Sequence, residues 1–395
     1  MFGWHSQGCC PDNNFKIENM KKLCILCIAS IALLSSCNEN YDNVIVTTDG
    51  YAINWTAAAD SSTTGLITNF WNPTTQYFND ATTGSNFQYW PQAHGLDVMV
   101  DAYLRTSDAK YKTLFDQWFI GVQAGNGGSF LNYFYDDMEW NALALLRTYD
   151  ATKDEKFKTA SITIWKDIQT GWNTQGGGGI AWTKGAPESK NACSNGPACI
   201  LAARLFQQFA DPLDKEWALK IYDWEKSALF NPSTGAVNDN LNAATGVIST
   251  YVATYNTGTF IGSAVELFKI TGEKTYLNDA VKAANYTINK LTNNRILNQE
   301  GNGDLALFKG VFVRYFTELI QTPGLDSATK DRFVLFLKFN ANELWHSGTN
   351  KKFVTFTSNW TMAPNFLSET QYNAQLSGCM LIESAALLDK AGAFK

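Results

Sequence analysis

Histidine is scarce in this chain of 395 residues, which contains three histidines and eight cysteines. Five of the cysteines lie at or before position 37, which leaves Cys193, Cys199 and Cys379 in the rest of the chain. Three cysteines make no disulfide framework and none has the spacing of zinc ligands, so we expect buried thiols. A metalloenzyme built on histidine ligands is disfavoured, and we expect neither a metal nor another cofactor.

Basic residues are also in short supply, with 31 Lys and Arg against 37 Asp and Glu and a formal net charge of −6. Nothing in this balance indicates nucleic acid as a partner, because nucleic-acid binding depends on clustered basic residues. Aromatic residues are abundant instead, at 14% of the chain with 13 tryptophans. Because sugars stack their C–H faces on aromatic rings, this composition favours a neutral, ring-shaped ligand.

Long apolar runs are missing, since none reaches the roughly 20 residues of a transmembrane helix. The apolar run at 23–34 follows Lys21 and Lys22 and leads into Leu-Ser-Ser-Cys at 34–37, which fits a bacterial lipobox. We therefore expect an upstream mis-start at 1–19, a lipoprotein signal peptide at 20–36 and a tether at 37–50 that is lipidated at Cys37. The protein would then be an outer-membrane lipoprotein facing the periplasm or the exterior. An ordinary secretory signal is the alternative.

Proline-rich linkers and charge runs are absent as well, so residues 51–395 are predicted to form one domain. Apolar residues recur with a helical period in twelve segments. These are 52–70, 88–105, 109–120, 137–149, 155–171, 195–209, 213–230, 255–270, 274–291, 305–320, 327–344 and 371–388. Short turns with Asp, Ser or Thr caps alternate with long loops rich in Gly, Asn and aromatics. This alternation predicts an all-α (α/α)6 toroid whose inner helices are rich in Gly and Ser; an open solenoid is the alternative.

Two consecutive carboxylates, Asp136 and Asp137, stand inside an aromatic run at the start of a predicted inner helix. Adjacent like charges among aromatic rings raise the pKa of at least one of the two. A carboxylic acid and a carboxylate facing one substrate are the minimum equipment for glycoside hydrolysis, and neighbouring carboxyls favour the retaining geometry. Two other interpretations stay open: helix capping, or, with Glu139, an acidic metal-binding box in which Trp140 replaces the next acid.

Other residues that suit sugars occur at the entrances of the predicted inner helices. The glycines at 176–179 lack the Gly-Lys-Ser/Thr of a nucleotide loop, so we expect them to turn the backbone sharply and present Trp182. The candidate substrate-binding residues are Trp90, Gln92, His94, Trp140, Trp182, Asn191, Asn195, Tyr255, Asn256, Lys309 and Tyr372.

Several of these segments resemble glycoside hydrolase family 76, which contains bacterial endo-α-1,6-mannanases and related fungal cell-wall enzymes. The matching segments are Tyr-Trp at 89–90 through His94, Tyr-Asp-Asp-Met-Glu-Trp at 135–140, Gly-Gly-Ile-Ala-Trp at 178–182, Lys-Asn-Ala-Cys-Ser-Asn-Gly-Pro at 190–197, Tyr-Asn-Thr-Gly at 255–258 and Phe-Lys-Gly at 308–310. One departure from the family pattern is Thr257, because we expect glutamine at that position of the Tyr-Asn-x-Gly turn at 255–258.

The resemblance implies an (α/α)6 fold, retention of configuration and cleavage of α-1,6-linked mannan. It also implies that Asp136 is the nucleophile and Asp137 the general acid/base. A lipidated, acidic, aromatic-lined helical protein with such a site suggests a glycan-foraging, Bacteroides-like cell, and we expect a monomer. Two rival functions remain at this stage. One is a non-catalytic glycan-binding lipoprotein. The other is a toroid hydrolase or lyase for uronic acids, whose cations would be Lys190, Lys309 and Arg314.

Overall fold

A computed structural model describes residues 51–365 and 368–394, which belong to the compact unit Ile45–Lys395. The predictions for residues 1–50, including the signal peptide, the tether and the lipidation of Cys37, lie outside the described residues. Among the helices that are described, none is both long and apolar enough to cross a membrane.

Twelve α-helices make up most of the described chain, and they match the twelve predicted segments. They are α2 (Trp55–Phe70), α3 (Tyr89–Thr106), α4 (Lys110–Gly125), α5 (Tyr135–Thr152), α6 (Glu155–Gln169), α7 (Gly196–Phe209), α8 (Pro212–Ala228), α9 (Thr254–Thr271), α10 (Lys274–Lys290), α11 (Leu305–Gln321), α12 (Ser327–His346) and α13 (Tyr372–Lys390). The largest departure is α4, which continues to Gly125 instead of ending at position 120.

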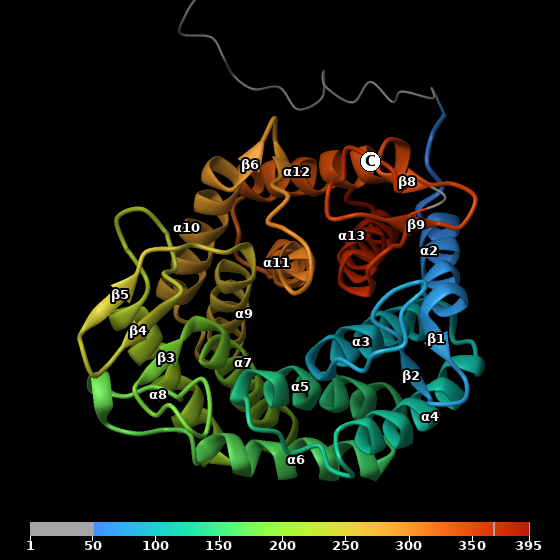
Figure 1. Ribbon diagram of the computed structural model, residues 1–395. Coiled ribbons are helices and arrows are strands. Elements are labelled where there is room, and N and C mark those ends of the chain that lie inside the picture. The colour runs from blue at the N-terminus through green and yellow to red at the C-terminus, as the bar shows by residue number, and fades with distance from the viewer. Residues whose placement is uncertain (1–50, 366–367, 395) are drawn as a thin grey trace, which may run out of the picture. The chain divides into compact units, whose positions relative to one another are not determined.

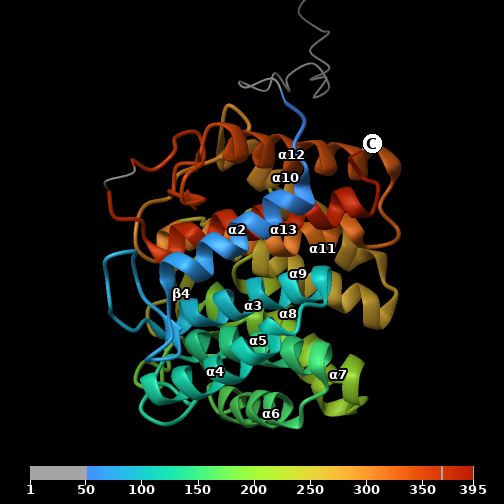
Figure 2. The ribbon, with the colours of Figure 1, turned by 90° about the vertical axis from the view of Figure 1, so that its right-hand side faces the viewer.

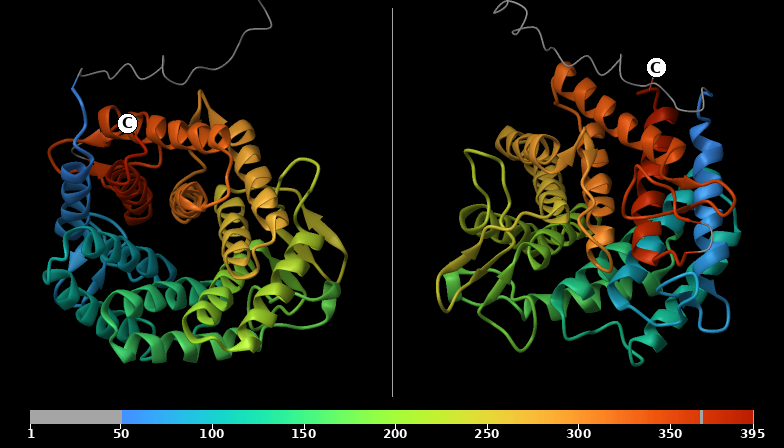
Figure 3. Two further views of the ribbon diagram at one scale, coloured as in Figure 1. Left: turned by 180° about the vertical axis from the view of Figure 1, so that it is seen from behind. Right: turned by 45° about the horizontal axis from the view of Figure 1, so that its top comes forward.

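The helices form two concentric rings (Figures 1 and 3). The inner ring consists of α3, α5, α7, α9, α11 and α13, each packed on the next, and α13 packs on α3 to close the ring. The remaining six helices lie outside it. This closure confirms the predicted all-α (α/α)6 toroid and is inconsistent with an open solenoid.

The two rings differ in sequence because they differ in burial. The outer helix α6 buries one face, with Phe157, Ile164 and Ile168 at helical spacing, and exposes the other. The inner helix α9 is buried on nearly all sides. Small residues let inner helices approach closely: a Cβ atom at Gly258 would lie 2.6 Å from the Cα atom of Phe312 on α11. Glycine is therefore needed there for the ring to close.

Connections from inner to outer helices are short, as predicted. The turns after α3, α5 and α7 each begin with a residue in the left-handed conformation, namely Ser107, Lys153 and Ala210, which ends the preceding helix. Asp154 and Asp211 then cap α6 and α8 by accepting a hydrogen bond from a backbone N–H of the first turn.

Connections from outer to inner helices are long and contain every strand of the described chain. Three are hairpins: β1 (Trp71–Asn72) with β2 (Tyr77–Phe78), β6 (Thr292–Asn293) with β7 (Ile296–Leu297), and β8 (Thr349–Asn350) with β9 (Thr355–Phe356). The fourth sheet has the order β3 (Ser189–Asn191), β4 (Asn240–Asn242), β5 (Val247–Ser249). Because each long connection enters an inner helix, these loops gather at one end of the rings (Figure 2).

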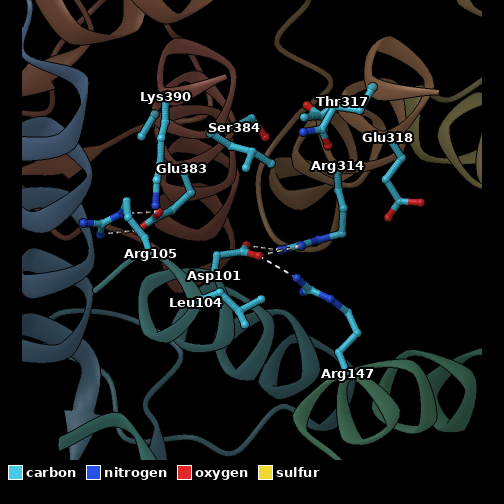
Figure 4. A pocket seen from close by; sticks show the side chains of 13 residues that line it. Asp101, Leu104, Arg105, Arg147, Arg314, Thr317, Glu318, Glu383, Ser384 and Lys390 are labelled. Carbon is cyan, nitrogen blue, oxygen red and sulfur yellow. Dashed lines mark hydrogen bonds and ion pairs between the residues drawn. The ribbon is translucent and has the colours of Figure 1, made fainter. Parts of the chain in front are cut away.

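Ion pairs join the inner helices away from the ends that the long loops enter (Figure 4). Arg147 on α5 and Arg314 on α11 both contact Asp101 on α3, at 2.6 and 3.0 Å. Arg105 contacts Glu383 on α13 at 2.9 Å. These groups line a cavity of about 240 Å³. Since each arginine is already paired with a carboxylate, this network ties the helices of the ring together.

Candidate active site

The two aspartates lie in the first turn of α5, where a loop from the outer ring enters the inner ring. This loop is held against the next one, because the backbone N–H of Tyr135 donates to the carbonyl of Trp182 at 3.0 Å and Phe134 forms a β-bridge with Thr183. The arrangement places the indole of Trp182 beside Asp136. The helix also presents its positive end to both carboxyl groups.

A cleft of about 600 Å³ opens at this position. It is lined by residues from the long connections and the first turns of inner helices: Trp90, Phe134, Asp136, Asp137, Trp140, Trp182, Asn191, Cys193, Asp239, Asn240, Tyr255, Asp304 and Phe308. Seven of the predicted site residues are therefore brought together here, including both aspartates. Four aspartates line the cleft, and its described lining includes no lysine or arginine.

Asp136 is held by two side-chain donors. Its Oδ2 atom accepts hydrogen bonds from Nε1 of Trp182 at 3.1 Å and from the Cys193 thiol at 3.3 Å. Burial raises the pKa of Asp136 to about 6, although both hydrogen bonds act against that rise by favouring the charged form. Asp136 is therefore a buried carboxyl group that can ionise near neutral pH.

Asp137 has a different environment. No side-chain hydrogen bond to its carboxyl group occurs within the described part of the chain. Burial raises the pKa of Asp137 well above its ordinary value, and the charges of Asp136 and Asp304 raise it further. The geometry thus separates two adjacent carboxyl groups, so that Asp136 ionises first and Asp137 keeps its proton.

Aromatic rings form the walls of the cleft. Trp90 donates from Nε1 to Asp304 at 2.9 Å, which fixes its indole beside Trp140 at a centroid distance of 6.3 Å. Tyr255 stacks on Phe308 with centroids 3.8 Å apart and planes inclined by 14°. Rings fixed in this way present flat apolar surfaces without loss of side-chain entropy on binding.

Comparison with known proteins identifies the family. The family model described as "Glycosyl hydrolase family 76" matches residues 54–395. The chain belongs to this family. The predicted resemblance is therefore confirmed, and the (α/α)6 ring with its acidic cleft is the family 76 architecture in this chain.

Solved structures show the same architecture. The family 76 chain is 40% identical to the GH76A alpha-1,6-mannanase from Salegentibacter sp. HEL1_6, with 85% of this chain and 100% of that chain covered and a TM-score of 0.82. An inactive variant of that mannanase, with two consecutive aspartates changed to asparagine, has been solved in complex with alpha-1,6-mannotriose. A Bacteroides thetaiotaomicron family 76 mannosidase, 21% identical with a TM-score of 0.75, shares the fold.

Fungal relatives match over a shorter region. The chain is 25% identical to a mannan endo-1,6-alpha-mannosidase of Candida glabrata over 232 residues, which cover 52% of this chain and 50% of the yeast protein. The chain thus spans about half the length of that relative.

Six predicted site residues of this family 76 chain lie behind the cleft lining, and three of them hold the backbone of other segments. The amide of Gln92 exchanges two hydrogen bonds with the backbone of Phe78, at 2.9 and 2.7 Å. Asn195 accepts a hydrogen bond from the backbone N–H of Ile180 at 2.8 Å. Lys309 is buried and donates to the carbonyl of Ser358 at 2.6 Å. The structure does not place these three polar groups in the cleft, because they anchor the long loops.

Tyr372, Asn256 and His94 are the other predicted residues that the cleft lining omits. Tyr372 is buried and stacks on Phe78, and Asn256 donates to Asp239 at 2.9 Å. His94 packs against the rings of Trp90 and Trp140, and burial lowers its pKa to about 3. His94 is therefore neutral, and it supports the two indoles from behind.

Several residues of the cleft lining were not predicted from the sequence as site residues, namely Cys193, Asp239, Asn240, Phe134 and Phe308. Cys193 was expected only as a buried thiol, yet its S–H donates to Asp136. A signal existed for it, since Cys193 lies inside the family-like segment 190–197. No sequence signal marked Asp239 and Asn240 as site residues, because an Asn- and Asp-rich stretch before Gly246 is typical of a turn.

Proposed function

We propose that this family 76 chain is a retaining endo-α-1,6-mannanase. The observation that carries the proposal is the pair of consecutive aspartates in an aromatic cleft, with the donors on Asp136 and none on Asp137. The Salegentibacter mannanase is inactive when two consecutive aspartates are changed. Asp136 and Asp137 are the single pair of consecutive aspartates in this sequence, which supports assigning that role to them.

In the proposed first step, the ionised carboxylate of Asp136 attacks the anomeric carbon of a mannose unit. The bond from that carbon to the glycosidic oxygen breaks, and the departing oxygen takes the proton of Asp137. Trp182 and Cys193 orient the attacking carboxylate. The products of this step are a mannosyl ester on Asp136, an ionised Asp137 and a shortened mannan chain.

In the second step, the ionised Asp137 removes a proton from a water molecule, whose oxygen attacks the same anomeric carbon from the opposite side to Asp136. The ester bond breaks, Asp136 regains its charge, and the configuration of the sugar is retained after two inversions. Asp137 is again protonated, which restores the starting state.

A uronic-acid substrate is a weaker fit to the cleft. Lys190 and Lys309 are buried and donate to backbone carbonyls, and Arg314 is paired with Asp101. A sugar carboxylate would thus meet four aspartates without a compensating cation. A non-catalytic glycan binder is also disfavoured, because binding a neutral sugar gains nothing from burying two adjacent acids.

The decisive experiment is incubation of the protein with unbranched α-1,6-mannan, with product sizes and anomeric configuration followed over time. We expect mixed oligosaccharides early in the reaction and the α-anomer as the first product. A single small product from the outset would indicate action at chain ends. Activity on uronate polymers with none on mannan would overturn the proposal.

We also propose, from the sequence alone, that Cys37 carries a lipid that tethers a monomeric enzyme to the outer membrane. Changing Cys37→Ala should release the protein from membranes or leave it unprocessed. Recovery of a membrane-free protein whose N-terminus lies well beyond Cys37 would contradict this assignment.

A further inference from the structure

We propose that the cleft continues over the three-stranded sheet β3–β4–β5 and that Ser249 and Tyr251 there bind a further sugar unit of the polymer. The inference rests on the proposed function, since its ligand is the same mannan chain that the aspartates cleave. In this sheet β5 is the edge strand farther from the centre of the rings, and β4 separates it from β3 (Figure 1).

The register of the sheet aligns three polar residues in one row. Asn191 on β3 is opposite Asn240 on β4, and Asn240 is opposite Ser249 on β5. Directly opposite residues of antiparallel strands point to the same face of a sheet. Asn191 and Asn240 both line the cleft. Ser249 therefore extends that lining outward by one more strand, so that the row crosses two strand spacings, about 10 Å.

The other face of the same sheet packs inward. Lys190, which lies between Ser189 and Asn191 on β3, is fully buried and donates to the carbonyl of Gly179 at 2.6 Å. It is opposite Leu241, which is opposite Ile248. The two rows thus have different surroundings. The first row packs on the body of the protein at Lys190 and Leu241, while Ile248 on the edge strand is 40% exposed. The other row lines the cleft at Asn191 and Asn240.

Tyr251 follows Ser249 by two residues and is 50% exposed. Its ring makes no contact with another aromatic ring of the described chain. Burial of part of the side chain raises its pKa, and the charges of Glu300 and Asp239 act in the same direction. An exposed ring at the rim, next to a row of amide and hydroxyl groups, offers both stacking and hydrogen bonding to a neutral sugar.

The occupant is a mannose unit of the chain already held at Asp136 and Asp137, because the row is continuous with the cleft lining and no cation accompanies it. A protein partner would be expected to require a larger apolar surface than this short edge offers. A neutral, hydroxyl-rich ligand needs only the stacking ring and the polar row.

The test measures affinity against chain length in an Asp136→Asn, Asp137→Asn background, with α-1,6-manno-oligosaccharides of two to six units. Tyr251→Ala and Ser249→Ala are compared with Ile248→Ala, which changes the same strand on its other face. We expect Tyr251→Ala to weaken binding of the longest oligosaccharide about fivefold, or about 1 kcal/mol. Binding of the disaccharide, and all binding by Ile248→Ala, should stay unchanged.

Equal weakening at every length, or no weakening at any length, would overturn the sheet subsite. Tyr251→Phe, which keeps the ring, should retain most of the affinity, and Ser249→Ala should weaken binding of the longer oligosaccharides only. A loss at every length in both variants would show a folding defect and count against the proposal. Failure of the unmodified enzyme to cleave mannan would refute the proposed function instead. A length-dependent loss in Tyr251→Ala would still be observable in that case.

Discussion

At the cleft, Asp136 and Asp137 are buried in a lining without cations, whereas farther along the inner helices Asp97 lies within reach of two arginines. Both sites bury carboxyl groups in the same ring. Burial alone would raise the pKa of Asp97, but Arg147 and Arg314 outweigh it and hold that pKa below its ordinary value. At the cleft, burial prevails and the pKa of each aspartate rises. Among these three aspartates, the two arginines beside Asp97 account for the difference.

Asp97 and the two cleft aspartates therefore respond to pH with opposite signs. A carboxyl whose folded pKa is lowered, such as Asp97, contributes stability above its unfolded pKa, and that stability is lost as pH falls. A carboxyl whose folded pKa is raised, such as Asp137, imposes no penalty below its unfolded pKa, and stability is lost as pH rises toward the folded value. Glu383 is an exception among the paired acids, because burial outweighs Arg105 and leaves its pKa raised.

Arginine–carboxylate pairs thus hold inner helices together, whereas no arginine lies in the described lining of the cleft. A cation beside Asp137 would lower its pKa and remove the proton that the leaving oxygen needs. A cation beside Asp136 would favour its charge but weaken its attack. The absence of such cations from the described cleft lining is thus a requirement of the proposed chemistry.

The largest expected effect comes from removing the unpaired acids. Asp136→Asn should lower activity on mannan by roughly 10⁴-fold or more, because no glycosyl ester can form. Asp137→Asn should lower it by about 10²–10⁴-fold. With a substrate whose leaving group needs no proton, Asp137→Asn should still form the ester, and added azide should speed its release; both are measured by stopped-flow and product analysis.

Rescue of Asp136→Asn by azide, with Asp137→Asn dead on every substrate, would exchange the two roles. Near-normal hydrolysis of mannan by either variant would remove the pair from catalysis and leave helix capping as its function.

The next largest effect tests the paired region. Arg147→Met removes one of the two cations shared by Asp97 and Asp101 and should lower the free energy of unfolding by about 3 kcal/mol at pH 7. The kinetic constants of the folded enzyme should change less than about threefold, because Arg147 does not line the cleft. Urea unfolding and Michaelis kinetics at low temperature measure the two quantities.

The exposed pair formed by Lys153 and Asp150 is the matched control, and Lys153→Met should leave stability nearly unchanged. A loss of turnover by Arg147→Met as large as its loss of stability would show that the two regions are coupled.

Much of this fold follows from sequence because its determinants are local. Apolar residues at helical spacing, together with caps such as Asp154 and Asp211, define helices and short turns without reference to distant contacts. The aspartate pair was found for the same reason, since its two members are adjacent. The alternation of short and long connections then fixes which end of the ring carries the loops.

The rest of the site depends on contacts between separate connections. Cys193 donates a hydrogen bond to Asp136, which lies 57 positions away in the sequence. Trp90 donates one to Asp304, which lies 214 positions away. No periodicity reveals such pairs. Gln92 was predicted to bind substrate because amides form hydrogen bonds with sugar hydroxyls. Its amide is instead hydrogen-bonded to the backbone N–H and carbonyl of Phe78 in another loop. The sequence indicates which residue types lie near the opening of the cleft. The geometry of the loops determines which of those side chains can contact a substrate.

A smaller effect concerns Glu225 on α8, which is fully buried with both carboxyl oxygens lacking a hydrogen-bond partner among the described residues. Burial raises its pKa well above the ordinary value. Glu225→Gln should therefore become more stabilising, relative to the parent, as pH rises from 5 to 7. The slope is at most about 1.4 kcal/mol per pH unit, and urea unfolding at three pH values measures it.

The control is Glu216→Gln, on the exposed side of the same helix, which should show no such slope. A stability difference that shrinks with rising pH would mean that Glu225 has an ionic partner in solution and belongs with the paired acids.

The smallest expected effect tests how the cleft separates its two acids. Trp182→Phe keeps a ring beside Phe134 but removes the hydrogen bond to Asp136. Because that donor stabilises the charged carboxylate, its loss should raise the pKa of Asp136 above its value of about 6 and move the acidic limb of the kcat/KM profile to higher pH by about one unit. Cys193→Ala, which removes the second donor, should shift the limb in the same direction. Full pH–rate profiles on mannan measure both shifts, and turnover on the alkaline plateau should remain within about threefold of the parent. If the limb stays in place in both variants, burial and the helix terminus alone set the ionisation of Asp136, and the two donors serve only to orient it.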